Sequence, residues 1–334
     1  MNKPVNIGII GVGRFGKNYF STFNQLDNAL VTWICATEES DIKATLKKAN
    51  KDIKTTANYK DILDDKEVDA IAIVTPGSTH YPITKEALES DKHVIVEKPL
   101  AFNSKDAEKL VEISKEKKKI LMVGHLHLFN PAIRKLKSDI KTGLFGKINY
   151  MHSFGAGNGP VRQDMNALWD YFPHDVSILM YLLDQLPLSL SVNGASYLQK
   201  GVEDIATMDL EFPNGVFAIA IGTLLYPLKK RELTIVSEKL YAFFDDYSEN
   251  EKLKYYDNRP KIVGGKVIID DKKYQDIKID DIKPLTEQLK HFLDCIENGK
   301  EPLTGGDHAL KVIKVLESAQ KSLGKKGARV EVPQ

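Results

Sequence analysis

Residues 5–16 read Val-Asn-Ile-Gly-Ile-Ile-Gly-Val-Gly-Arg-Phe-Gly, and this stretch decides the fold. Its first half is a short apolar run that predicts a strand ending at Gly11, and the residues from Phe15 to Leu26 predict a helix. In the loop between them, the first glycine permits a tight turn and the second lets the backbone approach a pyrophosphate. The third lets helix and strand pack closely, and the helix N-terminus adds positive potential. This order predicts a dinucleotide-binding loop whose cofactor-binding residues are Gly11, Gly13, Arg14, Phe15 and Gly16. The alternative is a glycine-rich turn that binds no ligand.

The same alternation of strand and helix continues to about residue 125. Helical patterns near residues 41–51, 79–90 and 104–117 separate four further apolar stretches, which are Leu30–Ala36, Val68–Val74, His93–Val96 and Ile120–Gly124. Continuously apolar strands joined by helices predict a parallel sheet that is covered on both faces. Right-handed crossovers make such a sheet doubly wound. We therefore expect an α/β Rossmann domain over residues 1–125.

The pattern changes after residue 125. Helices are predicted near residues 131–142 and 168–183, and between them a strand near 147–154 and an irregular stretch over 155–166. From Leu188 to about Ile269 strand follows strand, with a hairpin turning at Pro213-Asn214-Gly215. Two helices near residues 285–298 and 307–323 end the chain. This order predicts an α+β domain over residues 126–334 with a large, mostly antiparallel open sheet, whose C-terminal helices can pack back on the Rossmann domain.

Composition excludes several classes of protein. The 334 residues include 47 Lys and Arg and 46 Asp and Glu, for a formal net charge of +1. This balance gives no electrostatic footprint for nucleic acid or an anionic membrane, and the N-terminal apolar run is too short to span a bilayer. Cys35 and Cys295 lie in apolar segments without a CxxC pair, which predicts reduced thiols in a cytoplasmic protein.

The end of the second predicted strand bears on the choice of cofactor. A Rossmann domain usually carries there an Asp or Glu that binds the ribose, but this sequence reads Cys35-Ala36-Thr37-Glu38. Ala36 holds the usual acidic position, and we expect Thr37 and Glu38 to bind the ribose instead. A carboxylate there favours NAD because it repels a 2′-phosphate. Since Ala36 also leaves room for a phosphate, NADP is the alternative.

Two further groups of residues indicate chemistry. The strand at residues 93–96 ends in Glu97-Lys98-Pro99, which places a lysine at the carboxyl edge of the sheet, where doubly wound folds bind ligands; the alternative is a solvated turn. Asp170 and His174 lie four residues apart and so share one helical face, an arrangement that suits a general base. A capped helix start with a satisfied histidine is the alternative reading. A metal pair would lack a clear third ligand, so we expect no metal.

The combination of these motifs resembles the Gfo/Idh/MocA family of sugar and polyol oxidoreductases. The matching motifs occur in family order and are Gly11–Gly16, Thr75-Pro76 with His80, Glu97-Lys98-Pro99, Asn130-Pro131, Gly143 to Gly146, and Asp170 with His174. The resemblance implies an N-terminal Rossmann domain and a C-terminal domain with a large open sheet. It also implies a cis peptide between Lys98 and Pro99 and a homodimer or homotetramer formed through the sheet face.

The resemblance assigns a role to each matching residue. Lys98 would polarise the reacting hydroxyl, His174 would act as acid and base, and Asp170 would orient His174 or bind substrate. The nicotinamide half of the cofactor would be lined by Thr75, Pro76, His80 and Glu97. The implied reaction transfers hydride between NAD(P) and a secondary hydroxyl or ketone of a sugar.

Departures from the family pattern bear on the substrate. Leu128 replaces a basic residue of many members, and we expect His127 to serve instead. The polar stretch before Asp170 suits a hydroxylated ligand and resembles the nucleotide-sugar branch, with substrate contacts expected from Arg162, Asn166 and Trp169. The basic run over residues 229–231 is read as a solvated turn or as a diphosphate contact. The alternatives are a free-polyol dehydrogenase of the inositol type and a non-catalytic nucleotide-sensing regulator.

Overall fold

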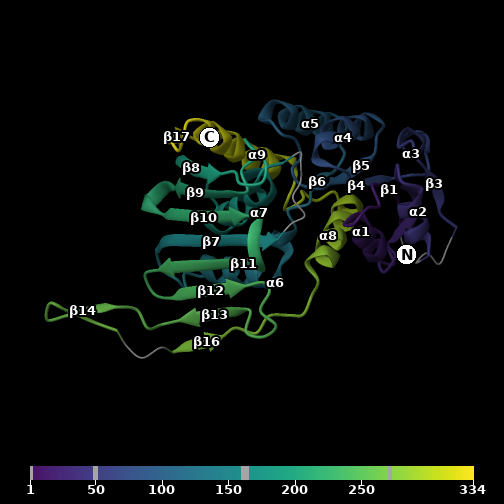
Figure 1. Cartoon of the computed structure of the whole chain (residues 1–334). Helices are drawn as coiled ribbons and strands as arrows, with labels where there is room; N and C mark the ends of the chain where they lie inside the picture. The colour runs from purple at the N-terminus through teal and green to yellow at the C-terminus, as the bar shows by residue number, and fades with distance from the viewer. Residues whose placement is uncertain (1–2, 48–51, 159–164, 270–272) are drawn as a thin grey trace. The chain divides into compact units, whose positions relative to one another are not determined.

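The computed structural model describes residues 3–47, 52–158, 165–269 and 273–334 (Figure 1). It divides into two compact units, one made of residues 1–129 and 283–313 and the other of residues 130–282 and 314–334. The segment 283–313 belongs to the first unit, in agreement with the expectation that C-terminal helices of the second domain can pack back on the Rossmann domain.

The first unit contains a six-stranded parallel sheet with the strand order β3-β2-β1-β4-β5-β6. Its strands are β1 (Val5–Ile10), β2 (Ala29–Cys35), β3 (Lys54–Thr56), β4 (Ala70–Ile73), β5 (His93–Val96) and β6 (Leu121–Val123). The chain runs outward from β1 in one direction and then outward from β4 in the other, so the switch point of the topology lies between these two strands. This confirms the predicted doubly wound Rossmann fold.

The helices of this unit pack mainly through apolar side chains. They are α1 (Gly16–Phe23), α2 (Glu39–Leu46), α3 (Lys60–Asp64), α4 (His80–Glu89), α5 (Ser104–Glu116) and α8 (Pro284–Asn298), with the short helices η1 (Gly77–Thr79) and η2 (Leu126–Phe129). One core cluster joins strand residues such as Ile73 and Val96 to helix residues such as Leu88 and Leu110. The sequence missed β3 because it is short and polar, and α3 because five residues are too few to show a helical period.

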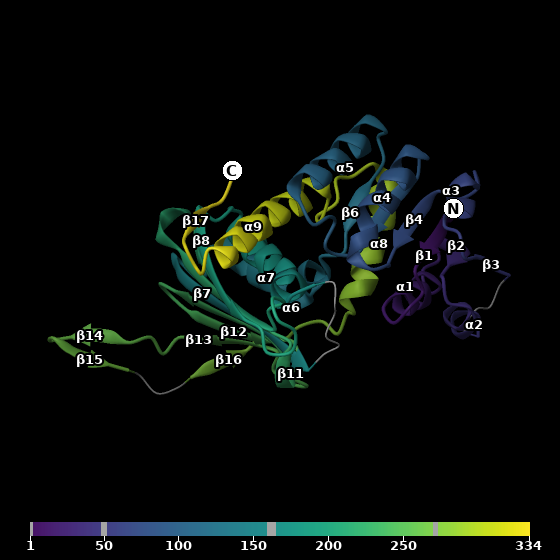
Figure 2. The same ribbon diagram turned by 45° about the horizontal axis from the view of Figure 1, so that its top comes forward.

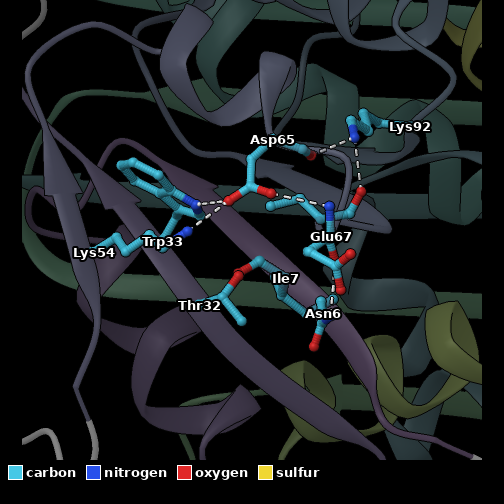
Figure 3. Close-up of polar contacts among 9 residues, drawn as sticks. Asn6, Ile7, Thr32, Trp33, Lys54, Asp65, Glu67 and Lys92 are labelled. Atoms are coloured by element: carbon cyan, nitrogen blue, oxygen red, sulfur yellow. Dashed lines mark hydrogen bonds and ion pairs between the residues drawn. The ribbon is translucent and has the colours of Figure 1, made fainter.

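A polar network fixes the loop between α3 and β4, beside the amino ends of β4 and β5 (Figure 3). The Asp65 carboxylate accepts hydrogen bonds from Trp33 Nε1 at 2.8 Å and Lys54 Nζ at 2.9 Å, and these donors lower the pKa of Asp65 to about 2. Lys92 Nζ donates at 2.8 Å to the carbonyl oxygens of Asp65 and Val68. A cavity of about 820 Å³ at this edge is lined in part by Lys92. It lies at the amino ends of the strands, whereas doubly wound folds bind ligands at the carboxyl ends.

The second unit contains a nine-stranded sheet with the order β16-β13-β12-β11-β7-β10-β9-β8-β17. Its strands are β7 (Ile148–Asn158), β8 (Ser189–Ala195), β9 (Ile205–Glu211), β10 (Phe217–Thr223), β11 (Leu225–Ser237), β12 (Tyr241–Asp245), β13 (Leu253–Tyr256), β16 (Tyr274–Asp276) and β17 (Val330–Glu331). Only the β7–β10 pair is parallel among the strand pairs of this sheet in the described residues. The mostly antiparallel sheet and its β9–β10 hairpin are confirmed.

One face of this sheet is covered by helices and the other is open (Figure 2). The covering helices are α6 (Pro131–Lys141), α7 (Ala167–Leu183) and the part of α9 (Gly306–Gly324) that lies in this unit. In β10 the side chains of Ala218 and Ala220 are buried, while the alternate residues Phe217, Ile219 and Ile221 are partly exposed on the open face. A separate two-stranded hairpin, β14 (Lys261–Val263) and β15 (Lys266–Ile268), extends beyond the sheet.

The strand β7 is longer than the sequence predicted. The pattern indicated an irregular stretch from Gly155, but β7 continues to Asn158. A Cβ atom at Gly155 would lie 2.7 Å from the ring of Tyr171, and one at Gly157 would lie 3.2 Å from the Tyr171 hydroxyl. These glycines therefore allow α7 to pack closely against a regular strand. The prediction that they belong to an irregular stretch was wrong.

Candidate active site

The glycine loop has the geometry that a pyrophosphate requires. Gly11 has φ +92°, and a Cβ atom there would lie 2.5 Å from the carbonyl oxygen of Val74. A Cβ atom at Gly16 would lie 2.0 Å from the Gly11 carbonyl oxygen, so only glycine lets α1 begin so close to β1. At Gly13 the only atom within 4 Å of an added Cβ, among the described residues, is Asp41 Oδ2 at 3.9 Å. The backbone of Gly13 thus has room for a ligand, while Arg14 and Phe15 are exposed at the start of α1.

Two carboxylates, not one, lie near the position expected to bind the ribose. Thr37 and Glu38 are exposed after β2, and Glu38 is the N-cap residue of α2. Asp41, in the first turn of α2, forms a 2.6 Å ion pair with Lys17 on α1 and is the side chain that approaches Gly13. Sequence reasoning missed Asp41, because its distance along the chain from β2 gives no signal of this approach.

His80 ties together two loops at the carboxyl ends of β4 and β5. Its buried ring places Nδ1 2.7 Å from the carbonyl oxygen of Pro99 and Nε2 2.9 Å from that of Thr75. Pro76, which follows Thr75, is exposed, and the peptide between Lys98 and Pro99 is cis as the resemblance implied. The ring of His80 therefore holds the turn that carries Lys98, and its predicted contact with nicotinamide stays a prediction.

Glu97 lies at the centre of several contacts within the first unit. Its Oε1 accepts a hydrogen bond of 2.7 Å from the hydroxyl of Tyr19 on α1, and its Oε2 accepts one of 3.3 Å from the backbone N–H of Lys98. A Cβ atom at Gly124 would lie 2.7 Å from Oε1, so the carboxylate packs directly on the backbone after β6. Burial raises the pKa of Glu97, and the Tyr19 hydrogen bond and the charge of Lys98 oppose this rise.

Histidines gather after β6 in the same unit. His125 is buried, and its ring meets that of His308 edge-on at 5.3 Å. Burial, reinforced by the charges of His308, Lys98 and His127, lowers the pKa of His125 well below its usual range. His127, predicted to bind substrate, lies in η2, within the electrostatic reach of His125. The sequence selected His127 and overlooked His125, whose buried ring is within the electrostatic reach of Lys98.

In the second unit, α7 carries the predicted acid–base pair. Asp170 and His174 both lie within this helix, which confirms that they share one helical face. Each is half-buried, whereas Asp175 beside them is fully buried. The helix runs through Pro173, which has no N–H to donate to the preceding turn.

A buried ion pair fixes the turn of α7 that holds His174. Arg231 Nη1 on β11 lies 2.9 Å from Asp175 Oδ1, and the Ser153 hydroxyl on β7 donates to the same oxygen. The Arg231 guanidinium also lies 5.8 Å from the centre of the Tyr171 ring. Arg231 thus contradicts the solvated-turn interpretation of the basic run over residues 229–231, whereas the diphosphate contact stays a prediction. It is a buried strand residue, not part of a solvated turn, and its charge is paired inside the unit.

Asn166 and Trp169 have structural contacts at the start of α7. The Asn166 side chain accepts from the Trp169 backbone N–H at 3.2 Å, as an N-cap, and donates to Glu203 at 2.8 Å. Trp169 is 8% exposed, and its Nε1 donates to Gln320 at 3.0 Å. Their contacts with substrate stay predictions, and Arg162 lies outside the described residues.

Neither a metal site nor a membrane span is found in the part of the chain that the structure describes. No group of three or more His, Cys, Asp or Glu there is arranged to hold a metal ion. No helix among the same residues is both long and apolar enough to cross a bilayer.

The glycine loop, the Lys98 turn and the second α+β unit together define a class, the dinucleotide-binding oxidoreductases with a two-domain architecture. Residues 5–125 match the family model described as an oxidoreductase family with an NAD-binding Rossmann fold, and residues 133–241 match that of the GFO/IDH/MocA C-terminal domain. The chain belongs to the Gfo/Idh/MocA family of oxidoreductases, and its first unit is an NAD-binding Rossmann domain.

Relatives of established activity are distant. The chain is 25% identical to the UDP-N-acetylglucosamine 3-dehydrogenase of Acidithiobacillus ferrooxidans, over 86% of this chain and 88% of that protein. It is 22% identical to the myo-inositol 2-dehydrogenase of Thermotoga maritima, over 96% of this chain and 97% of that protein. A solved structure of the Acidithiobacillus enzyme superposes with a TM-score of 0.84 at 20% identity, covering 98% of this chain and 99% of that one. The last comparison shows the shared fold.

Proposed function

We propose that this protein is an NAD-dependent dehydrogenase or ketoreductase that acts on a secondary hydroxyl or ketone of a nucleotide-linked sugar. The observation that carries the proposal is Lys98, which follows the carboxyl end of β5 in an NAD-binding Rossmann domain of this family. The turn around Lys98 is held by His80 and Glu97, so the lysine is on a fixed support. Bound NAD would supply the nicotinamide carbon that accepts hydride.

The proposed chemistry divides the work between two side chains. Lys98 stabilises negative charge as it develops on the reacting oxygen, and His174 takes the hydroxyl proton when the sugar is oxidised. Asp170, one turn earlier in α7, orients the imidazole or binds the substrate. In the reducing direction the imidazole returns the proton to the oxygen. Acid–base groups of this kind typically contribute about 10²–10⁴-fold to the rate.

The substrate assignment rests on the branch of the family that the polar stretch before Asp170 resembles. Similarity to a dehydrogenase of a UDP-linked sugar supports a nucleotide-linked substrate, and similarity to a myo-inositol dehydrogenase supports the alternative of a free polyol. A nucleotide-sensing regulator is disfavoured, because a sensor has no need for Lys98, Asp170 and His174 together.

Two titrations and a substrate panel test this proposal. Purified protein is titrated with NADH and NADPH while the fluorescence of the reduced nicotinamide is followed. Production of NADH is then measured with free polyols and with nucleotide-linked sugars. We expect tighter binding of NADH and turnover of at least one nucleotide-linked sugar. Turnover of polyols alone would establish the alternative substrate class, and nucleotide binding without any turnover would favour the regulator.

We also propose that the protein is a cytoplasmic homodimer or homotetramer formed through the open face of the second sheet. A row of neighbouring side chains, mostly aromatic, crosses six adjacent strands of this face and consists of Tyr274, Tyr256, Tyr241, Val236, Tyr150 and Phe217. Tyr150, the fifth of these six side chains, is 43% exposed. Contiguous apolar surface of this kind marks interaction sites. The two cysteines are buried free thiols, which suits a reducing compartment.

A further inference from the structure

Tyr19, on the dinucleotide-binding helix, makes a contact that reaches beyond this helix to the end of β5. It lies on α1, three residues after Gly16, and is fully buried. Its ring packs edge-on to Phe15 at 5.8 Å and lies 6.4 Å from Phe23. The ring thus belongs to the packing of α1, and its hydroxyl is the part that reaches across to β5.

The hydroxyl of Tyr19 joins three elements of the first unit. It donates to Glu97 Oε1 at 2.7 Å and accepts from Gln288 Nε2 on α8 at 3.3 Å. Gln288 is fully buried, so the donor is shielded from water. This chain of hydrogen bonds runs from α8 through α1 to the residue directly before Lys98.

The surroundings of Glu97 leave it dependent on Tyr19. Burial alone would favour the protonated acid, and the groups that stabilise the carboxylate are the Tyr19 hydroxyl, the charge of Lys98 and the Lys98 backbone N–H. The carboxylate also packs on the backbone of Gly124 after β6, and α8 contributes the neutral Gln288, which donates to the Tyr19 hydroxyl. The buried Tyr19 itself stays protonated, because burial and Glu97 raise its pKa well above the usual range.

We infer that Tyr19 is a positioning residue that holds Glu97 as a carboxylate against the Lys98 turn and so links the dinucleotide-binding helix to the reacting end of the site. This inference rests on the proposed function, in which Glu97 lies beside the nicotinamide. An ionised Glu97 favours the cationic ring of NAD⁺ over the neutral ring of NADH. Tyr19 would thereby bias the site toward the oxidised cofactor without touching it.

The test compares affinities for NAD⁺ and NADH as a function of pH, which requires no knowledge of the sugar. In the unmodified protein the preference for NAD⁺ should rise with pH as Glu97 ionises, by about tenfold overall. Tyr19→Phe keeps the ring and removes the donor, so the midpoint of this rise should move up by about one pH unit. Glu97→Gln should abolish the rise, and Tyr19→Phe should add nothing in the Glu97→Gln background.

The possible outcomes separate this inference from the function on which it rests. If the unmodified protein binds neither nucleotide, the proposed function and the inference both fail. If it binds both and Tyr19→Phe weakens them equally without moving the midpoint, Tyr19 has only a packing role and the inference alone is overturned. Persistence of the pH dependence in Glu97→Gln would overturn it as well. Circular dichroism and thermal unfolding of each variant confirm that the comparison concerns folded protein.

Discussion

At Gly16 a single methyl group decides whether the nucleotide loop can form. An alanine would place its Cβ atom 2.0 Å from the carbonyl oxygen of Gly11, a distance that backbone atoms must shift to avoid. We expect Gly16→Ala to weaken NADH binding by at least about tenfold, because α1 must move away from the pyrophosphate position. Gly324→Ala is the matched control, since nothing lies within 4 Å of its added Cβ among the described residues. Equal NADH affinity in the two variants would contradict this account.

The choice between NAD and NADP depends on which carboxylate meets the ribose. Glu38 is the residue that the sequence indicated, and Asp41 is the one that approaches Gly13. We predict that Glu38→Gln lowers the preference for NADH over NADPH by about tenfold, as expected when a charge-assisted hydrogen bond is lost. The same titration of Asp41→Asn shows whether the second carboxylate shares this role. If both variants kept the preference for NADH over NADPH unchanged, neither carboxylate would determine the choice of cofactor.

The residue scale also shows why the site was only partly predictable. The short motifs that contain Gly11, Lys98 and His174 could be recognised from the spacing of their residues. The contacts that support them join residues far apart in the chain. Tyr19 and Glu97 are 78 residues apart, and Asp175 and Arg231 are 56 apart. Because no local period relates such pairs, only the folded chain shows that they meet.

At the scale of elements, the buried ion pair between α7 and β11 makes a strong prediction. Arg231→Met would leave the fully buried Asp175 without its countercharge, and we expect a loss of about 3–5 kcal/mol in the free energy of unfolding. The double variant Asp175→Asn with Arg231→Met should recover part of this loss, because no unpaired charge then remains. Urea unfolding measures all three proteins. If Arg231→Met alone were as stable as the unmodified protein, the ion pair would not be what holds α7.

Two partly buried histidines of the first unit predict how its stability depends on pH. Burial, with nearby lysines, lowers the pKa of His93 and of His308 to about 4, against about 6.5 in an unfolded chain. Between these values the unfolded chain binds protons that the folded one does not, so stability falls as the pH falls from about 6.5 to 4. His93→Asn should reduce this fall, measured by urea unfolding at several pH values. An identical slope in the variant would contradict the assignment to His93.

Elements differed in how well the sequence predicted them. Strands such as β1 and β5 are buried on both faces and read as unbroken apolar runs, so their type and place were predictable. The short elements β3, β16 and β17 carry mostly polar or exposed residues, and their pairing with a neighbouring strand is what makes them strands. Their formation depends on tertiary contacts and leaves little trace in local sequence.

At the scale of the whole molecule, the open face of the second sheet predicts self-association. Tyr150→Glu places a charge within the row of side chains that crosses the six strands, between Val236 and Phe217. We expect the unmodified protein to be a dimer or tetramer and this variant to be a monomer that still binds NADH, as measured by light scattering after size exclusion. Tyr197→Glu is the matched control, since Tyr197 is 76% exposed in the loop after β8. A monomeric unmodified protein would refute the proposed interface.

Lys98 is proposed to assist hydride transfer between NAD and a sugar hydroxyl. The most direct measurement is the rate of NADH formation with the best substrate of the panel, for the unmodified protein and for Lys98→Met, with NADH affinity determined in parallel. Lys105→Met, on the exposed first turn of α5, controls for loss of a charge. Lys98→Met should lower turnover by about 10²–10⁴-fold while NADH still binds and Lys105→Met remains active. Turnover by Lys98→Met at the rate of the unmodified protein would contradict the proposed role of Lys98.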